Sequence, residues 1–269
     1  MQREKILELK DLHISFTQYT RGLSRRTIEN VSGLSLSTYA GEVAALVGAS
    51  GSGKSLLAHA VLGLLPYNAS VSGDIFYRGE LLGQRRIENL RGTEIALVPQ
   101  GASYLDPLMK SGAQILKGSR KQRKKRKLKE IFQRYHLKEE TEKLYPFELS
   151  GGMSRRILIA SATIEEPKLV IADEPTPGLE KETAKMVMGH FRELAEMGSS
   201  VLVITHDLEL AVETADRIFV MQDGRVVEEA FPADFREEGT LRHPYTKALW
   251  RAMPCHGFAW DRVGEDGEK

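Results

Sequence analysis

The chain has 269 residues, of which 41% are hydrophobic and 28% charged, as expected for a soluble globular protein of one large or two modest domains. Its one cysteine, Cys255, excludes an intrachain disulfide, a CxxC zinc ribbon and a cysteine-ligated iron–sulfur cluster. Its apolar runs are far shorter than the ~18–20 residues of a membrane span, and its N-terminus does not resemble a secretory signal, so we expect a cytosolic protein.

The charges balance overall but are unevenly distributed. Lysine and arginine total 38, aspartate and glutamate total 37, and the net charge is +1. Yet the run from Lys117 to Lys129 holds nine basic residues in thirteen positions and no acid. Such a run can bind nucleic acid or anionic lipid, but no aromatic residue interleaves it for base stacking. We interpret it as a solvated, partly helical face, with lipid contact as the alternative, and expect no nucleic-acid partner.

Four short apolar runs predict strands that are buried on both faces, as in a parallel sheet. They are Val43 to Val47, Ile95 to Val98, Leu169 to Ala172 and Val201 to Ile204. Helical patterns lie between them: one carries Leu57, Val61, Leu64 and Leu65 and is closed by Pro66, and another runs from Ala184 to Met197 and ends at Gly198. This alternation predicts a doubly wound α/β sheet.

The domain organisation follows from the same patterns. Residues from about 108 to 162 are predicted to be mainly helical and to form a subdomain inserted between the second and third strands. We place the main domain at residues 1–235 and a short C-terminal extension at 236–269, whose polar end should fray.

The first strand runs into a glycine-rich turn that fits the phosphate-binding pattern G-x-x-x-x-G-K-[ST], in the strand-to-helix context that this motif requires. The turn consists of Gly48, Ala49, Ser50, Gly51, Ser52, Gly53, Lys54 and Ser55, and Leu56 completes the expected ATP contacts. Glycines let backbone N–H groups close round phosphates, and the helix start adds positive charge. We expect Lys54 to meet the β- and γ-phosphates and the Ser55 hydroxyl to bind Mg²⁺.

Polar residues also follow the other three strands, at the edge where ligands bind in open parallel sheets. Asp173 and Glu174 are adjacent and face opposite sides, so Asp173 is expected to hold Mg²⁺ and Glu174 to orient or deprotonate the attacking water. His206 follows the fourth strand and could donate to a γ-phosphate. Gln100 follows the second strand after Pro99, and is either a site residue or an ordinary loop amide.

A second glycine cluster, Ser150-Gly151-Gly152, precedes a helical run that begins near Met153. Ser150 is a good helix N-cap. A Ser-Gly-Gly turn at a helix start is also an anion-binding geometry. From the residues alone, both interpretations stay open.

Taken together, these motifs resemble the ATP-binding cassette (ABC) transporter ATPases, in order and near spacing, from about Ile6 to Val227. The resemblance implies a P-loop NTPase (RecA-like) sheet core with an inserted α-helical subdomain. It implies that Gln100 senses Mg²⁺ and the γ-phosphate, that His206 contacts the γ-phosphate, and that Phe16, or failing that Tyr19, stacks on adenine. It also implies that Ser150, Gly151 and Gly152 act in trans on ATP held by a partner cassette.

The resemblance extends to the importers of dipeptides, oligopeptides and nickel. It rests on Met153 after Ser-Gly-Gly, on Tyr145-Pro146 before it, and on the stretch from His243 to Leu249. Because peptide-handling members often carry a cysteine-rich tail, which a chain with only Cys255 lacks, we favour nickel or metal-chelate cargo, with peptides as the alternative. Two departures are Glu180, where aspartate is usual, and Gly101 after Gln100; neither removes a catalytic group.

The resemblance therefore implies an ATP-hydrolysing subunit that lies peripherally on the cytoplasmic face of the inner membrane. Its implied partners are a second ATPase subunit, homologous rather than identical, two transmembrane permease subunits and an extracytoplasmic solute-binding protein. The alternatives are a non-transport ABC ATPase and a nucleotide-binding module that does not hydrolyse ATP. Intact Glu174 and His206 argue against the second.

Overall fold

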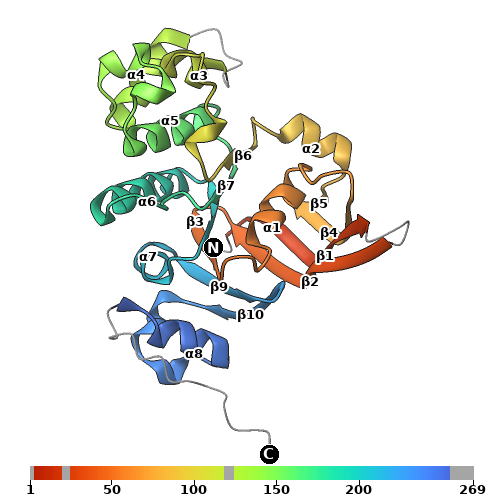
Figure 1. Ribbon diagram of the computed structural model, residues 1–269. Helices are drawn as coiled ribbons and strands as arrows, with labels where there is room; N and C mark the ends of the chain where they lie inside the picture. The colour runs from red at the N-terminus through yellow and green to blue at the C-terminus, as the bar shows by residue number, and fades with distance from the viewer. Residues whose placement is uncertain (1–2, 20–24, 118–123, 255–269) are drawn as a thin grey trace, which may run out of the picture.

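The computed structural model describes residues 3–19, 25–117 and 124–254. Its centre is a six-stranded sheet in the order β10-β9-β3-β8-β7-β6 (Figure 1). The strands are β3 (Glu42–Val47), β6 (Ile95–Val98), β7 (Leu169–Asp173), β8 (Ser200–Thr205), β9 (Arg217–Gln222) and β10 (Arg225–Ala230). All neighbours are parallel except the β9–β10 pair. The four apolar runs are therefore parallel strands of this sheet, as expected, and the run from Ile95 to Val98 is its edge strand.

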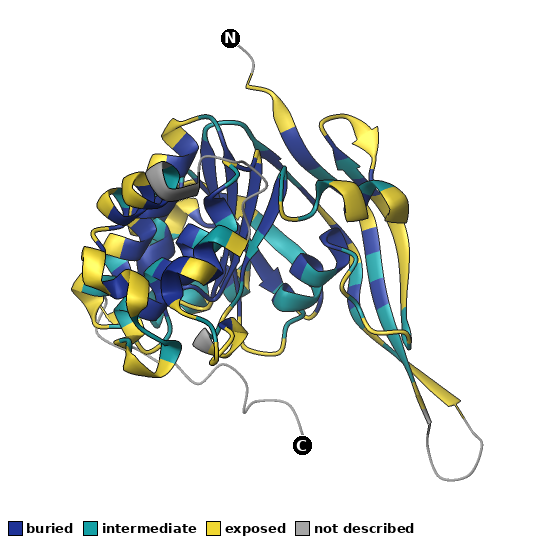
Figure 2. Cartoon of the chain, turned by 90° about the horizontal axis from the view of Figure 1, so that it is seen from above, coloured by how far each residue is buried: buried dark blue, intermediate teal, exposed yellow. Residues whose placement is uncertain are grey.

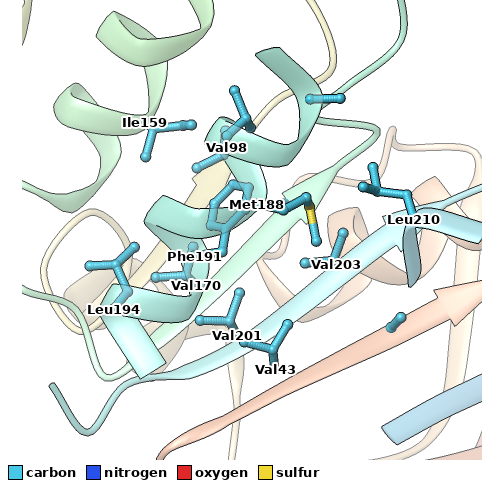
Figure 3. Close-up of a cluster of buried hydrophobic side chains, with 14 of the residues drawn as sticks. Val43, Val98, Ile159, Val170, Met188, Phe191, Leu194, Val201, Val203 and Leu210 are labelled. Carbon is cyan, nitrogen blue, oxygen red and sulfur yellow. The ribbon is translucent and has the colours of Figure 1, made fainter. Parts of the chain in front are cut away.

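Each of the four apolar runs contributes to two hydrophobic clusters, which explains why the run is apolar at every position. In β3, Val43, Ala45 and Val47 face one cluster, whereas Ala44 and Leu46 face the other. The first cluster joins the sheet to α6 (Lys181–Glu196), and Figure 3 shows side chains of that helix lying against those of the strands. The second joins it to α1 (Lys54–Val61) and to a second sheet.

The second sheet is antiparallel, in the order β2-β1-β4-β5, and the sequence analysis did not predict it. Its strands are β1 (Lys5–Tyr19), β2 (Arg25–Tyr39), β4 (Ala69–Tyr77) and β5 (Glu80–Leu81). Many positions in β2 alternate between more buried and more exposed, as Figure 2 shows along the projecting strands. Such strands contain no continuous apolar run, so the pattern that predicts fully buried strands does not occur in them.

Three helices lie together at one end of the molecule, away from the second sheet (Figure 1). They are α3 (Ser111–Lys117), α4 (Lys124–Arg134) and α5 (Gly151–Thr163), with short 3-10 turns η2 (Glu139–Lys143) and η3 (Pro146–Glu148) between α4 and α5. The mainly helical character expected for residues 108–162 is thus observed. Part of the basic run from Lys117 to Lys129 lies outside the described residues.

One helix expectation was wrong at its end. The pattern through Leu64 and Leu65 predicted a helix up to Pro66, but α1 stops at Val61. Gly63 adopts φ 62°, and the N–H groups of Gly63 and Leu64 return to the carbonyls of Ala60 (3.1 Å) and His59 (2.8 Å). This pair of hydrogen bonds, with a left-handed glycine, is a Schellman motif that ends the helix. The second predicted helix begins three residues earlier than expected, as α6.

The remaining helices are α2 (Gln84–Leu90), α7 (Leu208–Thr214) and α8 (Pro244–Arg251), with 3-10 turns η1 (Ala102–Tyr104), η4 (Pro232–Arg236) and η5 (Glu238–Thr240). The segment around α8 packs onto the first cluster through buried Phe235 and Leu241, before the helix, and Met253, after it. The indole N–H of Trp250 donates to the Phe235 carbonyl over 2.7 Å. Within the described residues, no helix is both long and apolar enough to cross a bilayer.

Candidate functional site

The glycine-rich turn joins β3 to α1 at the carboxyl edge of the central sheet. Gly51 and Gly53 adopt φ 81° and φ 98°, which L side chains rarely adopt. At Gly48 the constraint is space, because an added Cβ would lie 2.2 Å from the carbonyl oxygen of Met221 in β9. The hydroxyl of Ser52 is buried and has no hydrogen-bond partner among the described residues. A buried polar group left open in such a turn suits a phosphate ligand.

Lys54 is buried and turns back into this loop. Its ammonium donates to the carbonyl oxygens of Gly48 and Ala49, each over 2.9 Å. Burial lowers the pKa of Lys54, while the nearby carboxylates of Glu174 and Asp173 act in the opposite direction. The loop thus holds a positive charge beside the place where phosphate oxygens are expected.

Ser55 and Asp173, each expected to bind Mg²⁺, meet across the edge. The Ser55 hydroxyl, in the first turn of α1, donates to Oδ1 of Asp173 at the end of β7 over 2.9 Å. Two neighbouring ligands of an octahedral Mg²⁺ ion, each about 2.1 Å from the metal, lie about 3 Å apart. The pair offers two hard oxygen atoms at that separation and so fits the ion. Burial raises the pKa of the Asp173 carboxyl, and the hydrogen bond from Ser55 offsets this only in part.

Glu174 and His206 form the second pair. Nδ1 of His206 lies 2.8 Å from Oε2 of Glu174. The Glu174 side chain is 10% exposed and the His206 side chain 59% exposed. The pair therefore joins a buried carboxylate to an imidazole that is accessible from solvent. Glu174 adopts φ 46°, a strained conformation of the kind that clusters at functional sites. Its N–H donates to the Ile204 carbonyl of β8 (2.9 Å), which fixes the turn.

The second glycine cluster lies at the start of α5. Ser150 is the N-cap, and its hydroxyl accepts from the Met153 N–H over 3.3 Å, so the capping interpretation is confirmed. A Cβ added to Gly152 would lie 3.1 Å from the Thr183 methyl group of α6, and one added to Gly151 would lie 3.9 Å from Leu179. The contacts found for the two glycines are therefore with the segment after β7 and not with the phosphate loop of the same chain.

Two other expected site residues have no described contact with the phosphate loop. Gln100 is exposed after β6, and the carbonyl of the preceding Pro99 accepts from Arg155 of α5 over 3.3 Å. Phe16 of β1 pairs with Ile28 and Ala69 in the second sheet and is half-buried. Tyr19, the alternative to Phe16, has a side chain outside the described part of the structure.

One contact at the loop was not predicted. The hydroxyl of Tyr245, in α8, accepts from the N–H of Ala49 over 3.0 Å. Tyr245 also lines a cavity of about 400 Å³ with loop residues and with the turn between β9 and β10. No local pattern predicts this contact, because 196 positions separate the two residues.

The comparisons with known proteins agree with this geometry. Residues 31–177 match the family model described as ABC transporter. The chain is 36% identical to the dipeptide transport ATP-binding protein DppD of Bacillus subtilis (strain 168), covering 93% of this chain and 77% of that protein. It is 34% identical to the oligopeptide transport ATP-binding protein OppD of the same organism, covering 93% and 72%.

Solved structures agree as well. The fold superposes with a TM-score of 0.71 on the dimeric ATP-binding cassette MJ0796 bound to ADP and Pi, at 26% identity, covering 84% of this chain and 99% of that one. Together with the family match, this identifies the α/β sheet and its inserted helices as those of an ABC cassette. The chain belongs to the ABC transporter family and is an ATPase that binds ATP.

Proposed function

We propose that the protein is the ATP-hydrolysing subunit of an importer of dipeptides or oligopeptides. The observation that carries this proposal is the convergence of Ser55 with Asp173, and of Glu174 with His206, at the edge that also holds the phosphate loop. Four groups of the types needed for phosphoryl chemistry meet there from separate parts of the chain. The cargo assignment is supported by the names of the relatives, which transport peptides.

In the proposed mechanism the residues from Gly48 to Leu56 hold the phosphates through N–H groups, and Lys54 leaves its carbonyl partners to meet the β- and γ-phosphates. Ser55, Asp173 and Gln100 would hold Mg²⁺, which when bound neutralises charge on the phosphate oxygens. Glu174 takes a proton from the attacking water. His206 keeps the Glu174 carboxylate in place and contacts the γ-phosphate, and Phe16 stacks on adenine.

The site is completed by a second, homologous cassette in this proposal. Ser150, Gly151 and Gly152 would close over ATP bound to the partner, and the partner's equivalent residues over ATP bound here. Two observations support this. The three residues have no described contact with their own phosphate loop, and the cassette MJ0796 forms a dimer in its ADP- and Pi-bound structure.

The permease partners are proposed to dock beside the helical group. Tyr104, Leu108 and Phe147 are 63%, 88% and 77% exposed, which is unusual for large apolar side chains gathered in one region. Tyr145 stacks on Phe147 at 5.6 Å between ring centres, and the Lys110 ammonium lies 5.7 Å from the Tyr145 ring centre, so the segments around 108 and 147 are adjacent. This patch would hold the subunit against two permease subunits, on the cytoplasmic face of the membrane. An extracytoplasmic solute-binding protein would deliver the cargo to those permeases.

This docking proposal has a direct test. Phe147→Asp should reduce recovery of the subunit with membranes that contain its permeases, while leaving its affinity for ATP unchanged. Tyr67→Asp, which changes a fully exposed aromatic residue outside the patch, is the matched control. Equal membrane recovery of the two variants would remove the patch from the proposal.

Nickel cargo, which the sequence analysis favoured, has no support among these relatives, whereas the peptide alternative agrees with them. The chain has one cysteine and still matches proteins named for dipeptide and oligopeptide transport, so its cysteine count does not favour nickel. The stretch from Lys117 to Lys129 stays interpreted as a solvated face.

Uptake in the native host tests the proposed function. Labelled dipeptides, oligopeptides and nickel are offered to wild-type cells and to cells carrying a chromosomal Glu174→Gln substitution. Loss of peptide uptake alone is expected. Loss of nickel uptake alone would overturn the peptide assignment, and unchanged uptake of all three would overturn the role in import while leaving ATP hydrolysis in place.

A further inference from the structure

The contact between α8 and the phosphate loop joins two segments that sequence analysis treated as separate. The Tyr245 hydroxyl accepts the hydrogen bond of the Ala49 N–H over 3.0 Å. Ala49 is the second residue of the loop, directly after the tightly packed Gly48. A side chain from the C-terminal segment thus fixes a backbone group where the loop leaves β3.

Hydrogen bonds at the start of α8 hold the backbone of Tyr245 in place. Glu228 of β10 accepts from the N–H groups of Arg242 (2.7 Å) and His243 (3.0 Å), immediately before α8. Nδ1 of His243 then caps the helix by accepting from the Tyr245 N–H over 3.2 Å. Pro244 at the first helical position sets the backbone for this start.

A second anchor holds the far end of α8. The Trp250 indole N–H donates to the Phe235 carbonyl (2.7 Å), and the Arg251 guanidinium pairs with Glu238 over 2.7 Å. The helix is therefore fixed at both ends against β10 and the turns that follow it. Because the helix is fixed, the Tyr245 hydroxyl that it carries is a fixed hydrogen-bond acceptor for the loop.

The conformational freedom of the phosphate loop explains why such an anchor would help nucleotide binding. The loop contains three glycines in eight residues, and glycine loses more conformational freedom on ordering than any other residue. Ligand binding to a loop that is already ordered avoids part of that entropic cost. A cavity of about 400 Å³ lies between Tyr245, the loop and the β9–β10 turn, and the Tyr245 hydroxyl bonds directly to the loop at this cavity.

We propose that Tyr245 is a positioning residue for ATP: its hydroxyl holds the Ala49 N–H so that the rest of the loop is arranged for the phosphates before the nucleotide arrives. The C-terminal helix α8 is then part of the nucleotide site and not an appendage to it. This inference rests on the proposed use of the loop for ATP. It assigns Tyr245 no contact with the reacting atoms.

The test is Tyr245→Phe in the full-length protein, which removes the hydroxyl and keeps the ring. Because the bond lies at a partly exposed position, we expect ATP and ADP to bind about two- to fivefold more weakly. KM for ATP should rise by a similar factor, with kcat nearly unchanged. The matched control is Tyr135→Phe, which removes a hydroxyl bonded to Thr163 (2.7 Å) in the helical group. It should lower the thermal midpoint without changing KM.

A double-mutant cycle separates this route from general loosening. Ala49→Pro removes the donor N–H from the other side of the same bond, so adding Tyr245→Phe to it should weaken nucleotide binding no further. Unchanged affinity in Tyr245→Phe, an equal change in Tyr135→Phe, or additive effects in the cycle would each overturn the inference. If Ala49→Pro does not fold, the comparison of the two tyrosine variants decides. Failure of the proposed function has a different appearance, because peptide uptake would then be unchanged by Glu174→Gln while the nucleotide affinities of Tyr245→Phe and wild type still differ.

Discussion

Nδ1 of His206 lies 2.8 Å from Oε2 of Glu174, although 32 positions separate the two residues. Parallel pairing of β7 with β8 brings them together, since Asp173 is in register with Ile204 and each residue of the pair follows its strand at the same edge. The Glu174 N–H, bonded to the Ile204 carbonyl, then fixes the direction of the carboxylate. The backbone of Glu174 thus directs its carboxylate toward the site, and the His206 imidazole holds the carboxylate there.

The first prediction concerns this carboxylate. Glu174→Gln keeps the shape of the side chain and its contact with His206 but removes the base. ATP hydrolysis should fall by a factor of about 100 or more, while ATP affinity stays within about twofold of wild type because uniform binding is untouched. Steady-state phosphate release and equilibrium ATP binding measure the two quantities. The control is Glu88→Gln on the exposed face of α2, and equal hydrolysis in both variants would exclude Glu174 from the chemistry.

The second prediction separates binding from stability at Lys54. Lys54→Met keeps the aliphatic stem but removes the charged donor, so ATP affinity should fall by about 10- to 100-fold. Because burial lowers the pKa of Lys54, the fold already penalises its charged form. The thermal midpoint without nucleotide should therefore change little. Calorimetric titration and thermal unfolding compare this variant with Lys185→Met, at a partly exposed lysine of α6 that pairs with Glu213. A large loss of stability with intact ATP affinity would contradict the assignment.

Much of the site was predictable because its residues follow strands that the sequence marks clearly. Val43 to Val47 and Leu169 to Ala172 are apolar at every position, and a doubly buried parallel strand imposes that pattern directly. Once the strands are known, the residues after them must share one edge, which is how Ser55 and Asp173 could be expected to meet. The pairing of Glu174 with His206 follows from the same geometry.

The rest depended on features that leave no local pattern. The antiparallel sheet is built from strands exposed on one face, so its sequence alternates and contains no apolar run. The end of α1 depended on Gly63 adopting a left-handed conformation, against the apolar spacing of Leu64 and Leu65. The bond between Tyr245 and Ala49 needs the whole chain to fold before its two groups meet.

The third prediction concerns pH and Asp173. Burial raises the pKa of this carboxyl above its unfolded value. The folded protein therefore holds the proton more tightly than the unfolded chain does, and stability is lost as pH rises through the folded pKa. Above that point the buried charge destabilises the protein, so Asp173→Asn should raise the thermal midpoint at pH 7 by a few degrees. The same variant should lose Mg²⁺-dependent hydrolysis.

The pH dependence is the internal control for this effect. Below the unfolded pKa, near pH 4 for an aspartate, the wild-type carboxyl is neutral in both states, and the midpoints of Asp173→Asn and wild type should approach each other. Thermal unfolding at several pH values without Mg²⁺ measures the difference. A midpoint difference that stays constant from pH 7 to pH 4 would mean that the charge of Asp173 is not its source.

The fourth prediction compares two glycines with opposite surroundings. At Gly48, a Cβ would lie 2.2 Å from the Met221 carbonyl oxygen, so Gly48→Ala must displace the loop or β9. We expect a loss of about 1–3 kcal/mol in the free energy of unfolding, together with weaker ATP binding because the displaced backbone forms the phosphate site. At Gly189 in α6, a Cβ meets nothing within 4 Å, so Gly189→Ala should gain about 0.5–1 kcal/mol from helix propensity and leave ATP affinity unchanged. Urea unfolding and ATP titration of both variants give the comparison, and ATP affinity unaffected by Gly48→Ala would show that the loop tolerates the shift and that close packing on Met221 is not needed for the nucleotide.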